Sequence, residues 1–309
     1  MDYTNHTTCK LKNKAYNFVN KGQEEGKIKE AERNKFLDAF HSTIWMTYRK
    51  SFTSIIRPAI PKEEHYKSDA GWGCMLRSGQ MLLANSLARH SLGDNFSLSN
   101  LNKDNRIKYL SILIEFMDNL KDSNAAFSIG NIVEKGLKYK MVPKDWYGPT
   151  IIVSILSELN NTYNPFKDFR TIVFGDGVIY KDRIISLNEA ASVWSSSLLV
   201  LIAFRLGIKS VDPFNYEAII RLLDIPQCTG MIGGQGKAAL YFLGHQGSHL
   251  IFLDPHVTQV AVEKVETLWA EHLSYHYSTP LKLSIDKIDT CICYGITSLS
   301  FIRLLLKNS

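Results

Sequence analysis

The sequence has no long hydrophobic run. Its longest strongly apolar stretch, residues 198–204, falls far short of the roughly 20 residues that a membrane-spanning helix needs. The first nine residues are polar and include no apolar segment of the kind found in signal peptides. These absences argue against membrane and secreted proteins, and they predict a soluble chain.

Cysteine is scarce as well. Five cysteines are scattered without regular spacing over 309 residues, which argues against a disulfide framework and favours the reducing cytoplasm. Lysine and arginine exceed the acidic residues by 36 to 30, but they form no cluster, so we expect no nucleic-acid partner. With 45% hydrophobic and 11% aromatic residues, the chain has enough apolar material for a substantial folded core.

Motifs for phosphate and metal binding are incomplete. Residues 230–238 resemble a phosphate loop, but Met231 replaces its first glycine and Ala238 replaces its serine or threonine. His272 and His276 have the spacing of a metal-binding helix, yet no glutamate follows the first histidine. We therefore expect neither a cofactor nor a metal site.

Hydrophobic periodicity predicts the main elements. Residues 1–26 are polar and contain glycine, so we expect a mobile arm, within which residues 16–19 have the form of a short docking motif. Early helices followed by late strands indicate an α+β fold with a mainly antiparallel sheet. We expect helices at residues 27–50, 74–88, 106–120, 151–159, 216–223 and 301–306, strands at 198–204, 241–243 and 250–253, and a β-hairpin at 171–180.

Cys74 is the first candidate for chemistry. It follows Gly71-Trp72-Gly73 and precedes a run with helical spacing, so it should lie at the start of a buried helix after a sharp turn. The positive end of a helix dipole favours a thiolate, and its free N–H groups can stabilise an oxyanion. The alternative is a buried cysteine with a structural role only.

Asp254 and His256 are the second candidate. They are two residues apart at the end of a predicted strand, where they would point to the same side. A thiol nucleophile needs a base that accepts its proton and a third group that orients that base. An imidazole and a carboxylate suit these two roles, although a histidine at a strand end is often only structural.

Five segments follow one another along the chain: W-M-T-Y-R-K-S-F at 45–52, S-D-A-G-W-G-C-M-L-R-S-G-Q-M at 68–81, W-Y-G-P at 146–149, I-G-G at 232–234 and L-D-P-H at 253–256. In this order they resemble the autophagy-related protein 4 cysteine peptidases, or autophagins. The resemblance covers most of the chain.

This resemblance assigns roles to individual residues. It makes Cys74 the nucleophile, His256 the general base and Asp254 its orienting partner, with Tyr48 joining the Cys74 backbone N–H in an oxyanion hole. Trp146 would line a narrow entrance that admits glycine, as part of a substrate-binding loop that includes Gly148 and Pro149. It also implies that the loop at residues 226–229 covers the empty site.

The family implies a papain-like fold over residues 27–309, with a small auxiliary subdomain near residues 166–192. The implied activity is cleavage after the C-terminal glycine of the ubiquitin-like autophagy-related protein 8. Both the precursor and the form conjugated to phosphatidylethanolamine would be substrates, with transient membrane contact through the lipid. The alternatives are a papain-fold protease for another ubiquitin-like modifier and an adaptor that binds the modifier without cutting it.

Overall fold

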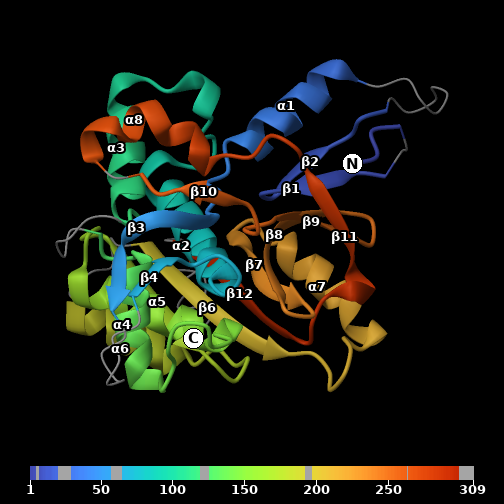
Figure 1. Cartoon of the computed structure of the whole chain (residues 1–309). Coiled ribbons are helices and arrows are strands. Elements are labelled where there is room, and N and C mark those ends of the chain that lie inside the picture. The colour runs from blue at the N-terminus through green and yellow to red at the C-terminus, as the bar shows by residue number, and fades with distance from the viewer. Residues whose placement is uncertain are drawn as a thin grey trace.

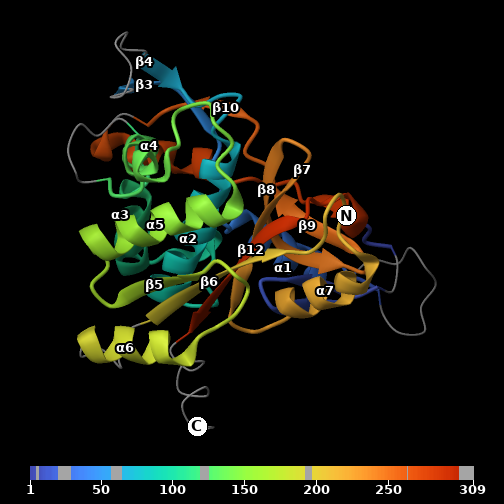
Figure 2. The same cartoon turned by 90° about the horizontal axis from the view of Figure 1, so that it is seen from below.

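The computed structural model describes residues 1–4, 7–19, 29–56, 65–118, 125–191, 197–262 and 264–298. Within this part of the chain, a nine-stranded sheet lies between two layers of helices, as Figures 1 and 2 show. Its strands run in the order β11-β9-β8-β7-β12-β6-β5, with β1 and β2 joined to it through β8. A smaller sheet has the order β10-β3-β4. The expected α+β class is confirmed, and the chain has the mixed architecture of a papain-like peptidase domain.

The elements of the first half of the chain supply most of the helices. They are β1 (Cys9–Leu11), β2 (Lys14–Tyr16), α1 (Glu30–His41), β3 (Tyr48–Ile56), β4 (His65–Ser68), α2 (Cys74–Leu92), α3 (Lys103–Ile114), α4 (Ile129–Gly136) and α5 (Pro149–Tyr163).

The second half supplies most of the sheet. Its elements are β5 (Phe169–Phe174), α6 (Lys181–Ala191), β6 (Ser197–Arg205), α7 (Tyr216–Leu223), β7 (Cys228–Gln235), β8 (Ala238–Gln246), β9 (His249–Leu253), β10 (Thr258–Val260), α8 (Leu268–Glu271), β11 (Leu281–Ser284) and β12 (Cys291–Ser298). Neighbouring strands of the large sheet are antiparallel except for β5 and β6.

Alternating side chains of β6 separate the two faces of the sheet. Leu199 and Leu201 pack into the main core with α2 and α5, whereas Leu198 and Val200 pack on the opposite face with Ile184 of α6. Helix α7 covers the same opposite face further along the sheet. Because both faces are covered, β6 is an apolar run without polar alternation.

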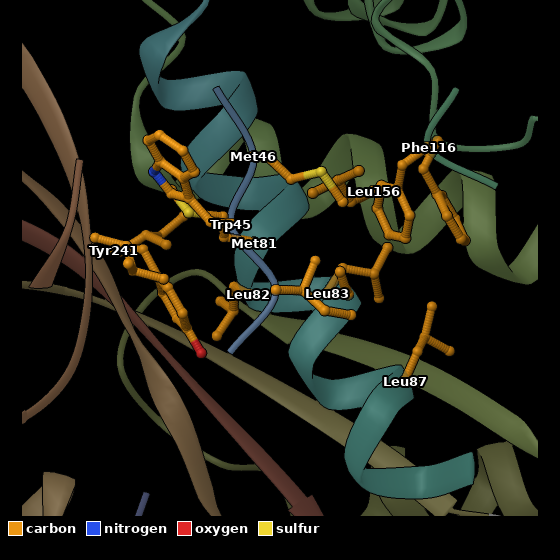
Figure 3. Packing of buried hydrophobic residues seen from close by; sticks show 14 of the residues in the cluster. Trp45, Met46, Met81, Leu82, Leu83, Leu87, Phe116, Leu156 and Tyr241 are labelled. Carbon is orange, nitrogen blue, oxygen red and sulfur yellow. The ribbon is translucent and has the colours of Figure 1, made fainter. Parts of the chain in front are cut away.

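Helix α2 is the centre of the main core, and the prediction of a buried helix starting at Cys74 is confirmed. Figure 3 shows its apolar side chains between Tyr241 of the sheet on one side and Leu156 of α5 and Phe116 on the other. A side chain at Gly79 would come within 2.6 Å of Ile152, so glycine there allows α2 and α5 to pack closely.

Two predicted elements are wrong in detail. The helix expected at residues 27–50 ends at His41, and Tyr48 begins strand β3 instead. The hairpin expected at residues 171–180 is a single strand, β5, which pairs in parallel with β6 and is followed by helix α6. The strand therefore belongs to the main sheet, and residues 166–192 as a separate subdomain stay a prediction.

The N-terminal residues differ from the expected mobile arm. Strand β1 pairs with both β2 and β8, and Cys9 and Leu11 are fully buried. Tyr16 and Val19 are also buried, so the proposed docking motif is covered by the protein's own core. The rest of the arm, residues 20–26, and the expected helix at residues 301–306 lie outside the described residues.

Candidate active site

Cys74 is the first residue of α2, and two glycines shape the turn before it. Gly71 has φ of +83°, a backbone conformation that favours glycine. Gly73 has an ordinary negative φ, but a Cβ atom there would lie 2.3 Å from Oδ2 of Asp69. The first glycine therefore permits the turn, and the second lets the backbone pass close to a buried carboxylate.

Asp254 and His256 lie in the loop directly after β9. The Nδ1 atom of His256 lies 2.5 Å from Oδ1 of Asp254, which also accepts the backbone N–H of His256 at 2.9 Å. The pair is thus held by a tight loop and not by the strand pleat that the sequence suggested. Two bonds tie this loop to the segment before β3: Trp45 Nε1 donates to Asp254 O at 2.7 Å, and Tyr48 N donates to Pro255 O at 3.0 Å.

The structure brings the Cys74 thiol to His256 and Tyr48. Burial raises the pKa of this thiol, but hydrogen bonds from His256, from the Ala239 backbone and from Tyr48 outweigh burial and lower the pKa overall. The hydrogen bond to Asp254, followed by the one to Cys74, raises the pKa of His256 to about 9. Both shifts favour charge separation between the thiol of Cys74 and the imidazole of His256.

Tyr48 is placed to donate a hydrogen bond near the sulfur. Its side chain is buried, and its ring meets the His256 ring edge to face at 5.4 Å between centroids. Burial, followed by the charge of Cys74, raises the pKa of Tyr48 well above its usual range. The hydroxyl thus keeps its proton and remains a donor.

The turn between β7 and β8 lies against Cys74. The carbonyl oxygen of Lys237 is 3.8 Å from the Cys74 sulfur. The loop at residues 226–229, expected here, lies instead at the other end of α2, where Pro226 O accepts a hydrogen bond from Arg89 at 2.6 Å. That prediction was wrong because this loop and the turn between β7 and β8 lie at opposite ends of strand β7.

The loop that contains Trp146 lies near the cysteine turn. Lys144 stacks over the ring of Tyr66 at 4.9 Å, and Tyr66 contacts Trp72, two residues before Cys74. Trp146 is 45% exposed, so its side chain is not part of the core. Gly148 caps α5 and Pro149 begins it, two residues before the start of the helix expected at residues 151–159.

A buried charge network beneath Cys74 was missed by the sequence analysis. Arg77 is 1% exposed and donates to Asp69 Oδ2 at 2.7 Å, to Asp118 Oδ2 at 2.8 Å and to Gln80 Oε1 at 3.0 Å. Asp69 also accepts the backbone N–H of Arg49 at 2.6 Å. The polar residues inside the cysteine motif were a signal for this network, since buried charges require partners.

The network connects strand β3, which begins at Tyr48, to the turn that precedes Cys74. Asp69 contacts the residue after Tyr48 on β3, and it packs against Gly73 immediately before Cys74. Its carboxylate therefore fixes the hydrogen-bond donor relative to the nucleophile. Together, a thiol with a lowered pKa, an imidazole, a carboxylate hydrogen-bonded to that imidazole and a phenol hydroxyl are the groups that a thiol hydrolase site needs. Among the described residues, no group of three His, Cys, Asp or Glu side chains is arranged to hold a metal ion.

Comparisons with known proteins agree with this class. A family model described as the Peptidase C54 catalytic domain matches residues 33–300. The chain is 32% identical over 277 residues to "Probable cysteine protease atg4" of Sclerotinia sclerotiorum, covering 82% of this chain and 61% of that protein. It is 30% identical over 286 residues to "Cysteine protease ATG4B" of Xenopus laevis, covering 85% and 71%.

The chain belongs to the Peptidase C54 family of cysteine peptidases, and the predicted resemblance is confirmed. It also matches "Cysteine protease ATG4B" of Oryza sativa subsp. japonica, with 30% identity over 305 residues. The chain spans 61% of the length of the Sclerotinia relative. No helix in the described ranges is both long and apolar enough to cross a membrane.

Proposed function

We propose that this protein cleaves after the C-terminal glycine of the ubiquitin-like autophagy-related protein 8. The substrates are the modifier's precursor and its conjugate with phosphatidylethanolamine. The observation that carries the proposal is the Cys74–His256–Asp254 arrangement with Tyr48 beside the thiol, in a chain of the C54 family. The protein would act in the cytoplasm and contact membranes transiently through the lipid of its substrate.

The reaction follows from the site geometry. The Cys74 thiolate attacks the carbonyl carbon of the terminal glycine, and the Tyr48 hydroxyl and the Cys74 backbone N–H stabilise the resulting oxyanion. His256 gives its proton to the departing nitrogen, which belongs either to the next residue or to phosphatidylethanolamine. A water molecule, deprotonated by His256, then hydrolyses the thioester, and Asp254 keeps the imidazole oriented throughout.

Substrate selection is assigned to the loop of residues 146–149. Its indole is exposed, and Lys144, two residues earlier, contacts Tyr66, which in turn contacts Trp72 of the cysteine turn, so this loop can narrow the path of an extended peptide. Glycine has no side chain to collide with such a wall. Gly148 and Pro149 fix the loop to the start of α5, which packs against α2.

The direct test uses the modifier extended beyond its terminal glycine, with intact mass as the measurement. The wild-type chain should release a product that ends in glycine, and Cys74→Ala should release none while still binding the modifier. Loss of a nucleophile can reduce the rate by about a millionfold. Cleavage at another position, or by the Cys74→Ala protein, would contradict the proposal. A ubiquitin precursor serves as the control substrate and should remain uncut.

A further inference from the structure

A cavity of about 60 Å³ lies at the end of α2 that is remote from Cys74. It is bounded by the turn between β1 and β2, by α1, by the last turns of α2 and by the starts of β7 and β8. The side chains that matter below are Lys12, Asn13, Lys14, Arg89 and Asp94. Arg89 is fifteen residues after Cys74, which corresponds to about 22 Å along a helix, so this cavity is separate from the active site.

The turn that brings lysine to the cavity has an unusual backbone. Lys12 and Asn13 have φ of +47° and +66°, and asparagine tolerates such values far better than lysine does. The turn is held in place by Lys12 N donating to Leu243 O at 3.0 Å and by Asn13 Nδ2 donating to Pro226 O at 2.6 Å. Positive φ at both positions is the ordinary geometry of a two-residue hairpin turn, and Lys12 occupies one of these positions although lysine is disfavoured there.

The charges around the cavity are unbalanced. When Lys12 is protonated, Lys12, Lys14 and Arg89 are all positive, and among the described lining residues Asp94 is the only acidic one, which leaves two positive charges in excess. Arg89 pairs with Asp94 at 2.6 Å, and Lys14 donates to Asn95 at 3.0 Å. Within the described part of the chain, the Lys12 ammonium has neither an ion pair nor a hydrogen bond.

Two further observations indicate what kind of ligand would fit the cavity. The Oδ1 atom of Asn13 is buried and has no hydrogen-bond donor among the described residues. Burial, followed by the charge of Lys14, lowers the pKa of Lys12 to about 7, while Asp38 opposes this shift. The titratable groups around Lys12 are Lys14, Asp38, Arg89, Asp94, Tyr16 and the buried His276.

We propose that this cavity binds a phosphate group, with Lys12 as its principal charge partner. Monohydrogen phosphate carries two negative charges, which match the local excess, and one hydroxyl, which can donate to Asn13 Oδ1. Sulfate has the same shape and charge but no proton to donate at neutral pH. The phosphate can be free in solution or part of a lipid headgroup, and the cavity is large enough for one such tetrahedral anion.

The first test is calorimetric titration of the full chain with sodium phosphate at pH 8, with sodium chloride at matched ionic strength as the reference. We expect saturable binding to the wild type, weaker binding of sulfate, and uptake of about one proton as Lys12 becomes charged. The proton number follows from repeating the titration in buffers that differ in ionisation enthalpy. Absence of saturable phosphate binding overturns the proposal.

The variants Lys12→Met and Lys12→Gly test the residue itself. Both should reduce phosphate affinity at least tenfold. Because glycine suits the positive φ at this position, a loss of affinity in Lys12→Gly cannot be attributed to poor folding. The matched control is Lys10→Met, because Lys10 lies two residues away on β1 and pairs with Asp224 at 3.3 Å outside the cavity. Equal affinity in wild type and Lys12→Gly, or an equal loss in Lys10→Met, contradicts the assignment.

The source of the phosphate is tested with vesicles. Sedimentation with phosphatidylcholine vesicles that contain phosphatidylinositol 4-phosphate, dependent on Lys12 and absent with phosphatidylcholine alone, assigns the site to a lipid headgroup. Binding of inorganic phosphate without sedimentation assigns it to a soluble phosphate. Neither readout requires peptidase activity, so the result is independent of the proposed function.

Discussion

The positive charges at the two ends of helix α2 differ in whether they have partners. At the Cys74 end, Arg77 is enclosed by Asp69 and Asp118, and both carboxylates accept further backbone hydrogen bonds. At the other end, Lys12 faces a cavity without a partner in the described chain. A closed network holds the reacting groups in one geometry, whereas an unpaired cation leaves room for a ligand to complete the site.

After Cys74→Ala, the largest expected effect at the catalytic end comes from Asp254→Asn. An amide cannot hold the charged imidazole in place as the carboxylate does, so turnover should fall roughly a hundredfold or more while the fold survives. Peptidase assays and thermal melting on the same preparation provide the measurement. A melting temperature within a few degrees of the wild type, together with near-normal turnover, would mean that Asp254 has no catalytic role.

The pH dependence of kcat/KM gives a finer view of the same pair. The reacting state needs thiolate and imidazolium, so activity should decline as the pH rises through about 9, where His256 loses its proton. Because the largest cause of that raised pKa is Asp254, the Asp254→Asn variant should lose activity at a lower pH on the alkaline side. An unchanged alkaline limb would show that another group controls it.

A matched pair of substitutions tests whether the network positions the nucleophile. Asp69→Asn and Asp118→Asn each remove one carboxylate from Arg77, and each should lower the free energy of unfolding by about 2–3 kcal/mol. Only Asp69 also contacts β3 and Gly73, so only Asp69→Asn should lower kcat, by about tenfold. Iodoacetamide labelling of Cys74 as a function of pH should show a raised thiol pKa in that variant alone. Equal kcat values in the two variants would reduce Asp69 to a structural role.

Trp146→Ala tests selectivity at the catalytic end. A wider path should lower the preference for glycine over alanine before the scissile bond, and looser positioning should also lower activity on glycine, since a 1 Å shift can cost about a hundredfold. The measurement is kcat/KM for matched glycine and alanine substrates on both enzymes. If the preference ratio does not change, the specificity wall lies elsewhere, and the turn between β7 and β8 is the next region to examine.

The smallest effect is expected at the cavity end. Lys12→Gly relieves an unfavourable backbone conformation and should raise the free energy of unfolding by about 0.5–1 kcal/mol. Chemical denaturation in phosphate-free buffer is the suitable measurement. A loss of stability would indicate that the Lys12 side chain contributes packing that outweighs the strain.

The sequence was informative where one segment contains its own pattern. The helix at Cys74, strand β6 and the proline at the start of α5 were all visible as local signals. Strand β7 was missed because it contains Gly230, Gly233 and Gly234, which suggest turns, and because its burial depends on distant partners. Strand β12, one of those partners, was missed as well. The parallel pairing of β5 with β6 was not predicted either, because helix α6 separates the two strands in the sequence.

The residues of the candidate site differ in the same way: some lie within a motif, and others are brought together only by the fold. Cys74, His256, Asp254 and Tyr48 were named from motifs, and the structure places them together. Asp118 was not named, because it is far from Arg77 in sequence and no motif connects the two. Lys12 was read as part of a polar arm, and only the pairing of β1 with β8 shows that it faces a cavity.

The pairing of β1 with β8 also affects the order in which the chain can fold during synthesis. Gln246 Nε2 donates to Asp2 O at 2.6 Å across 244 residues of sequence, and Lys10 pairs with His245 in the same strand contact. Strand β1 must therefore wait until β8, much later in the chain, has been synthesised. Contacts of such long range form late, so the N-terminal hairpin should dock near the end of folding. Until then Phe18 and Leu11, which the finished protein buries, are exposed to chaperones and proteases.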